Sequence, residues 1–317
     1  MTKLEKAALT AVRDCMFAKN GESILIVMDE PEKKIGYALF EAAKSLGCEA
    51  MVIEMLPREA NGQEPPPQIA NLMKQFDAVL VPTSKSLSHT KARRVASGSG
   101  VRIATLPGIL EATMVRALNA DYQRIAALSI KLCKILSEGQ TARVTAPAGT
   151  DITMSLKGRV GKPDTGLVKT ADDFSNLPAG EAYIAPVEGS GEGIIVVDGS
   201  MAGIGILQKP LSIMMEKGYA TGISGGAAAI KLKKMLDSAG MQARNLAELG
   251  IGTNYKAKLC GSVLEDEKVL GTVHLALGDN KSMGGKVSVP SHLDGIILKP
   301  TLYIDDVCII KSGKMLQ

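Results

Sequence analysis

Histidine and carboxylate residues gather between Asn245 and Asp294, in the last quarter of the chain. Two of the three histidines, His274 and His292, lie in this stretch. The acids before and between them are Glu248, Glu265, Asp266, Glu267, Asp279 and Asp294. Histidine and carboxylate are ligands that zinc, manganese, cobalt and ferrous iron share. The stretch therefore predicts a metal site, the alternative being two hydrogen-bonded histidines among solvated acids.

The sequence pattern around these residues favours a metal site. LGTVHLALG and HLDGIIL are apolar segments punctuated by glycine, so we expect them to be buried. A buried carboxylate needs a partner or a metal ion.

The chain before this stretch predicts a parallel sheet. Short apolar runs typical of buried strands alternate with amphipathic, helical segments. The runs are SILIVMD (23–29), CEAMVIEM (48–55), DAVLVPT (77–83) and VRIATLP (101–107). Residues 1–140 are accordingly predicted to form an α/β domain.

The pattern changes after Gly139. Residues 141–160 and 176–207 alternate apolar and polar positions in short, glycine-rich runs, as antiparallel strands do. We therefore expect residues 141–317 to form a mixed α+β domain, largely antiparallel, that carries the metal site and the catalytic residues.

Composition narrows the classes of function. Apolar residues make up 45% of the chain and charged residues 22%, the balance of a soluble globular protein. A net charge of +4, scattered basic residues and 3% aromatics argue against nucleic-acid binding. Five separated cysteines without a CxxC pair indicate a reducing compartment. No apolar run is long enough for a membrane span, so a cytoplasmic protein with no membrane or nucleic-acid partner is expected.

Four ordered motifs carry a family resemblance. They are NLPAGEAYIAPVEGSGEGIIVVDGS, AELGIGTN, EDEKVLGTVHLALGD and HLDGI. In this order they resemble the metallo-aminopeptidase family of aminopeptidase T and aminopeptidase S. The resemblance is dense from about Thr141 onward, and in the first half it rests on general architecture.

The resemblance implies an aminopeptidase-like hydrolase that cleaves amide or peptide bonds with a metal-activated water. Its substrate would be a small peptide or a small-molecule amide, its assembly a homodimer, and its cofactor two divalent ions per chain (zinc, cobalt or manganese). The implied ligands are Glu181, Glu248, Glu267, His274, His292 and Asp294. Glu248 or Glu267 would bridge the ions or carry the proton. Lys281 stands where the family has a tyrosine that helps to stabilise the oxyanion, and a lysine there is a flexible point charge.

Two other functions remain open. His274, His292 and Asp294 also make the two-histidine, one-carboxylate set of non-haem iron(II) oxygenases. A ring-cleaving dihydroxypyridine dioxygenase resembles the same aminopeptidase family, so one scaffold hosts both chemistries. Against a single iron stand Glu181, Glu248 and Glu267, which three-ligand coordination does not need. A binding or scaffold protein without metal would leave these carboxylates unexplained.

Overall fold

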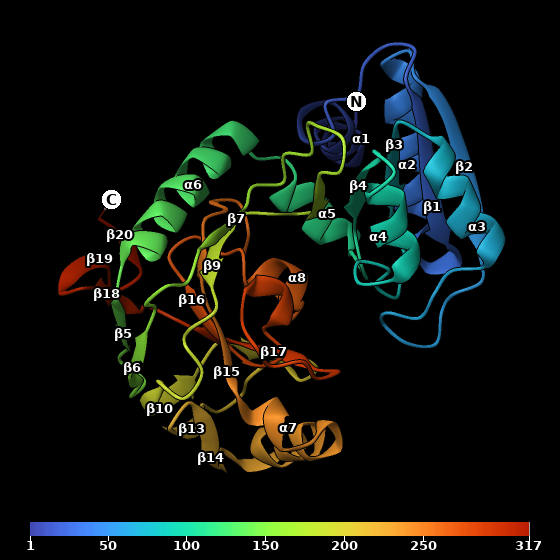
Figure 1. Ribbon diagram of the computed structural model, residues 1–317. Helices are drawn as coiled ribbons and strands as arrows, with labels where there is room; N and C mark the ends of the chain where they lie inside the picture. Colours follow the sequence, from blue (N-terminus) through green and yellow to red (C-terminus); the bar gives the residue numbers. More distant parts are fainter. Residues whose placement is uncertain (317) are drawn as a thin grey trace. The chain divides into compact units, whose positions relative to one another are not determined.

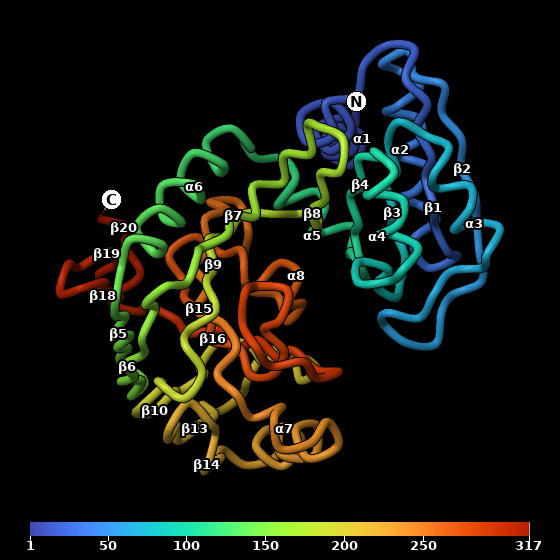
Figure 2. Tube along the Cα trace, viewed as in Figure 1, coloured from blue at the N-terminus to red at the C-terminus, as the bar shows by residue number. Residues whose placement is uncertain are grey.

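The chain passes three times between two units. The computed structural model describes residues 1–316 (Figures 1 and 2). Unit 1 comprises Met1–Ala126 and Thr165–Ala179, and unit 2 comprises Ala127–Asp164 and Gly180–Gln317. The predicted division at residue 140 is a single cut and differs from this path. The difference has two causes: one helix, α6 (Tyr122–Glu138), runs through the first crossing, and a later segment returns to unit 1.

Unit 1 contains a five-stranded parallel sheet in the order β2-β1-β3-β4-β8. Its strands are β1 (Ser23–Asp29), β2 (Glu49–Met55), β3 (Ala78–Val81), β4 (Arg102–Thr105) and β8 (Phe174–Asn176). Its helices are α1 (Lys3–Leu9), η1 (Thr10–Cys15), η2 (Glu30–Glu32), α2 (Lys33–Ser45), α3 (Pro67–Leu72), η3 (Met73–Gln75), α4 (Lys91–Ser97) and α5 (Glu111–Ala117).

Side-chain alternation along β1 shows that both faces of this sheet are covered. Leu25 and Val27 belong to a core that includes Ile69 of α3 and Met73 of η3. Met28 points to the opposite face, where it lies against Gly36 of α2: a Cβ on Gly36 would come within 2.3 Å of the Met28 sulfur. The predicted parallel α/β domain is therefore confirmed.

Unit 2 contains two antiparallel sheets. One has the order β14-β13-β10-β6-β5-β18-β19-β20 and the other the order β12-β11-β17-β16-β15-β9-β7. The strands of the first are β5 (Thr141–Thr145), β6 (Asp151–Ser155), β10 (Glu192–Val197), β13 (Leu211–Glu216), β14 (Tyr219–Ser224), β18 (Thr301–Ile304), β19 (Val307–Lys311) and β20 (Lys314–Met315). Those of the second are β7 (Lys162–Asp164), β9 (Glu181–Ile184), β11 (Ser200–Met201), β12 (Gly205–Ile206), β15 (Leu246–Gly252), β16 (Val273–Gly278) and β17 (His292–Ile297).

One hydrophobic core joins the two sheets of unit 2. It includes Val144 and Ile152 from the first sheet and Leu249 and Leu275 from the second, with Leu136 of α6. In Figure 1, α7 (Gly226–Ala239) packs beside β13 and β14. The short helices are η4 (Met241–Arg244), α8 (Val263–Asp266) and η5 (Lys281–Met283). The predicted mixed, largely antiparallel second domain is confirmed as a fold class.

Candidate metal centre

The strand register of the second sheet puts five of the predicted ligands on one face. Directly paired residues of antiparallel strands share a face, and so do residues two apart on one strand. Asp294 pairs with Ala276, which also pairs with Glu248. His274 and His292 flank Ala276 on this face, because His274 is two residues from it and His292 pairs with Gly278.

Small residues leave space for side chains on the face of the sheet that carries the candidate ligands. In β15 the face carries Glu248, Gly250 and Gly252, and Gly252 pairs with Glu181 of β9. The intervening residues, such as Leu249 and Ile251, point the other way into the core. Alternation thus divides β15 and β16 into a polar face with room for a cluster and an apolar face that packs.

Glu248 lies between the two histidines. Its Oε1 is 3.2 Å from His274 Nε2 and its Oε2 is 3.0 Å from His292 Nε2. Asp294 Oδ1 is 3.3 Å from the same His292 nitrogen. His274 is fully buried, whereas the His292 side chain is 30% exposed. A small molecule would therefore reach the cluster from the side of His292.

Lys268 is a second centre of the cluster. Its ammonium lies 2.6 Å from Glu181 Oε1, 2.7 Å from Glu267 Oε1 and 3.3 Å from Asp164 Oδ2. The other oxygen of Glu181 is 3.3 Å from His274 Nε2. His274 therefore connects the residues around Lys268 with those around Glu248.

The pKa values of the ionisable groups in this cluster are shifted in different directions. Burial works against ionisation of Glu248, but hydrogen bonds from His274 and His292 and their positive charges hold its pKa well below the usual range. Burial raises the pKa of Glu267 to about 8; Lys268 opposes this, while Glu181 adds to it. Burial also disfavours charge on both histidines, yet their carboxylate partners raise the pKa of each well above its ordinary value. A cation, either a proton or a metal ion, is required between these carboxylates and ring nitrogens.

The donor set fits a divalent metal. Two groups each bring three ligand atoms within 4.8 Å of one another: Glu181 with Glu267 and His274, and Glu248 with His292 and Asp294. His292 Nδ1 donates to the backbone oxygen of Asp279 at 2.8 Å, which turns Nε2 toward the cluster. Among the described residues, His274 Nδ1 is buried without a hydrogen-bond partner. An orphaned buried nitrogen of this kind needs an explanation such as a group that remains to be bound.

Other acids between Asn245 and Asp294 stabilise loops by accepting hydrogen bonds. Asp266 accepts a hydrogen bond from the Ser200 hydroxyl at 2.6 Å and another from the Cys260 amide at 2.7 Å. Glu265 accepts from the Lys258 amide. Lys281 is exposed at the start of η5, and neither ligand group includes it. Its predicted catalytic role stays a prediction.

Two residues of the cluster were missed from sequence: Asp164 and Lys268. Lys268 follows the acidic run LEDE directly, so it reads as a solvated charge, yet its side chain is only 1% exposed. The one signal was its place next to Glu267, a predicted ligand.

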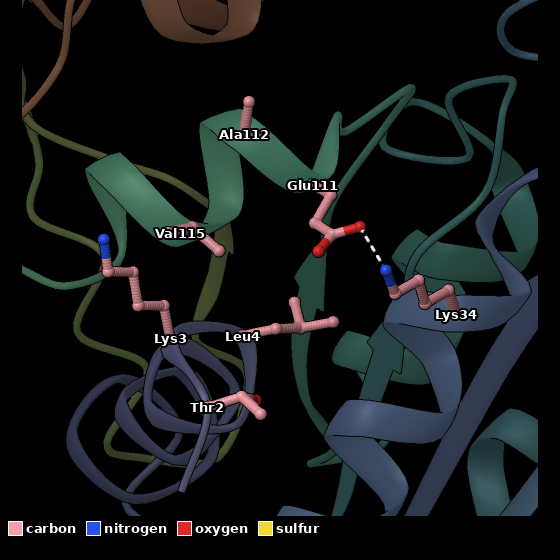
Figure 3. Close-up of a pocket in the computed structure, with 7 residues that line it drawn as sticks. All are labelled: Thr2, Lys3, Leu4, Lys34, Glu111, Ala112 and Val115. Carbon is pink, nitrogen blue, oxygen red and sulfur yellow. Dashed lines mark hydrogen bonds and ion pairs between the residues drawn. The ribbon is translucent and has the colours of Figure 1, made fainter.

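A surface hollow in unit 1 has no comparable chemistry (Figure 3). It is lined by Thr2, Lys3, Leu4, Lys34, Glu111, Ala112 and Val115. Two of its three charged residues, Lys34 and Glu111, pair with each other at 2.7 Å and are largely exposed. Surface ion pairs of this kind contribute little, and the lining includes no histidine or cysteine.

Comparison with known proteins decides the family. Residues 3–317 match the sequence model of the family described as NicX: 2,5-dihydroxypyridine 5,6-dioxygenase. The chain belongs to this family. A curated 2,5-dihydroxypyridine 5,6-dioxygenase from Pseudomonas putida is 24% identical over 256 residues, which is 74% of this chain and 70% of that protein.

Two solved structures share the fold. The 2,5-dihydroxypyridine dioxygenase of Pseudomonas putida KT2440 has a TM-score of 0.84 at 18% identity, over 100% of this chain and 98% of that one. AmpT from Thermus thermophilus has a TM-score of 0.75 at 18% identity, over 99% of each chain. The aminopeptidase resemblance is therefore correct as a statement about fold.

The predicted function is wrong in its main reading. Family and curated relative name a dioxygenase, so the prediction of a metallo-aminopeptidase, a hydrolase or protease of amide bonds, is overturned. The motifs that carried it position ligands on a shared scaffold, and a scaffold does not fix the chemistry. Among residues 1–316, no helix combines the length and the apolar character needed to cross a membrane.

Proposed function

We propose that this protein is a ring-cleaving dioxygenase that uses one ferrous ion and acts on a dihydroxylated pyridine. The observation that carries the proposal is the meeting of His274, His292 and Asp294 on one face of the sheet, around Glu248. Two histidines and one carboxylate are the ligand set of non-haem iron(II) oxygenases. Membership of the 2,5-dihydroxypyridine 5,6-dioxygenase family supports the class of substrate.

In this proposal His274, His292 and Asp294 hold the iron. A bound ferrous ion would supply the one-electron chemistry that lets dioxygen react with an aromatic ring. The protein orients His292 by the hydrogen bond from Nδ1 to the Asp279 carbonyl. Glu248 is ionised and holds Nε2 of both histidines close together; these nitrogens would exchange the carboxylate for the iron when the iron binds. The burial of His274 and Glu248 excludes water from one side, and the partly exposed His292 leaves the other side accessible.

The test is oxygen uptake after anaerobic loading with ferrous iron, with 2,5-dihydroxypyridine as substrate. We expect oxygen consumption and loss of ring absorbance in step with each other. Asp294→Asn should lower iron retention and uptake by at least about 100-fold, in line with removal of a metal ligand. The matched control is Asp306→Asn, at an exposed turn, which should behave as the wild type. Loaded protein that consumes no oxygen with any dihydroxypyridine isomer would refute the proposal. The predicted homodimer stays a prediction.

A further inference from the structure

We propose that the Lys268 ammonium occupies the place of a second cation beside the iron, so that this chain holds one metal and loss of the lysine creates a second metal site. The inference deepens the proposed function, because it says why a carboxylate-rich cluster supports chemistry with a single metal. It also assigns a partner to Glu181 and Glu267, the acids that a three-ligand iron leaves over.

The contacts of Lys268 are those of a fully satisfied cation. An ammonium has three N–H donors, and three carboxylates surround this one: Glu181, Glu267 and Asp164, at 2.6, 2.7 and 3.3 Å. The acids come from β9, the end of α8 and β7, so three elements of unit 2 converge on one nitrogen. Such a tripod of oxygens around a buried positive charge is also what a divalent ion requires.

The backbone holds the lysine in this position. Its amide donates to Glu265 O at 3.0 Å, and its carbonyl accepts from the Asn254 amide at 2.8 Å. The next residue, Val269, forms a bridge with Asn254. The side chain therefore enters the cluster from an anchored segment, and the ammonium is a permanent part of the site.

Charge explains why the lysine excludes a metal. A divalent ion held by Glu181, Glu267 and Asp164 would take the same three carboxylates that bind Lys268. Two cations on the same buried oxygens repel strongly at low dielectric. If the lysine is removed, the buried Glu181 and the half-buried Glu267 and Asp164 lose their counter-charge, a state that is unfavourable until another cation enters.

The test is the stoichiometry of manganese, a redox-inert probe, measured by equilibrium dialysis and elemental analysis without oxygen or ring substrate. We expect one ion per chain for the wild type and two for Lys268→Ala, whose neighbouring ions should also show exchange coupling by electron paramagnetic resonance. Lys311→Ala, an exposed lysine of β19, is the matched control and should bind one. A purely structural lysine would change stability without adding a metal.

Lys268→Ala alone is at risk of not folding, because it leaves Glu181, Glu267 and Asp164 without their shared counter-charge. The double variant Lys268→Ala/Glu267→Gln removes one negative charge with the positive one and retains the carboxylates of Asp164 and Glu181, with the new amide oxygen as a third ligand. It too should bind two ions. A wild type that binds two ions, or a folded variant that binds one, overturns the inference. Failure of ring cleavage in a wild type with one ion would overturn the proposed function alone.

Discussion

At the scale of single residues, buried ionisable groups in this protein keep their charge where an oppositely charged partner is present, and the charge is unfavourable where none is. Lys268 and its three acids are one paired case, and the Glu248 carboxylate between two histidines is another. Glu32 in unit 1 is different. It is 8% exposed, and burial together with the negative charge of Asp29 raises its pKa to about 7. Its charge is therefore unfavourable in the folded state.

The consequence is a testable dependence of stability on pH. The folded-state pKa of Glu32 lies above its unfolded value of 4.5, so the folded state binds more protons between pH about 4.5 and 7. The free energy of unfolding should fall as pH rises through this window. Glu32→Gln should remove that fall and stabilise the protein by about 1 to 3 kcal/mol at pH 8, and by little at pH 4.5. Urea unfolding of the wild type and the variant at pH 4.5 and pH 8 measures this difference in the free energy of unfolding. Glu30→Gln, an exposed neighbour, should change neither, and an equal effect of both variants would contradict the assignment.

At the scale of elements, the candidate metal centre depends on the glycines of β15, which leave space for side chains of the neighbouring strand. Gly250 pairs with His274 across the sheet, and a Cβ at Gly250 would come within 1.9 Å of His274 Nε2. The imidazole lies over the glycine, so the strand supplies room as well as a ligand. The same logic applies to Gly252, where a Cβ would meet the backbone oxygen of Val269 at 2.1 Å.

Gly250→Ala is therefore expected to displace His274 while the fold persists. We predict that metal affinity falls at least about tenfold, with loss of oxygen uptake, because a misplaced ligand is equivalent to a missing one. Titration with manganese, with far-UV circular dichroism to confirm folding, measures it. Gly222→Ala in β14 is the matched control, since its Cβ would be 3.4 Å from the nearest side chain. Wild-type affinity in Gly250→Ala would show that His274 is not a ligand.

The helices, the strands and the candidate ligands could be predicted from the sequence more easily than the contacts between them. The run SILIVMD gave β1 with its exact bounds, because a short apolar run between turn signals has few alternatives. His292 and Asp294 stand two apart and so had to share a face of a strand. Lys268 meets Glu181 across 87 residues, and it lies between α8 and β16, where no strand or helix pattern predicts the contact. β8 is three residues long with one buried position, which is too short for a periodic signal.

At the scale of the whole chain, α6 explains why a single boundary at residue 140 does not describe the units. Its Tyr122 and Ile125 lie in unit 1, while Leu132 and Leu136 are fully buried in the core of unit 2. A cut at 140 would leave that core open along one side. The last turns of α6 are thus part of the unit that carries the candidate metal centre, although the sequence pattern assigns them to the preceding α/β domain.

This predicts a difference between two fragments. Residues 127–317 retain Leu132 and Leu136, so this fragment should unfold cooperatively in urea and bind manganese. Residues 141–317 lack both side chains and should do neither, since exposing a core of this kind removes several kcal/mol from a margin of about 5 to 15. In the full chain, Leu136→Ala should lower the free energy of unfolding by about 2 to 5 kcal/mol. Ile130→Ala, on the same helix but 55% exposed, should lower it by less than about 0.5 kcal/mol. If the two fragments proved equally stable, α6 would be a connector that adds nothing to the core, and the metal centre would stand on its sheets alone.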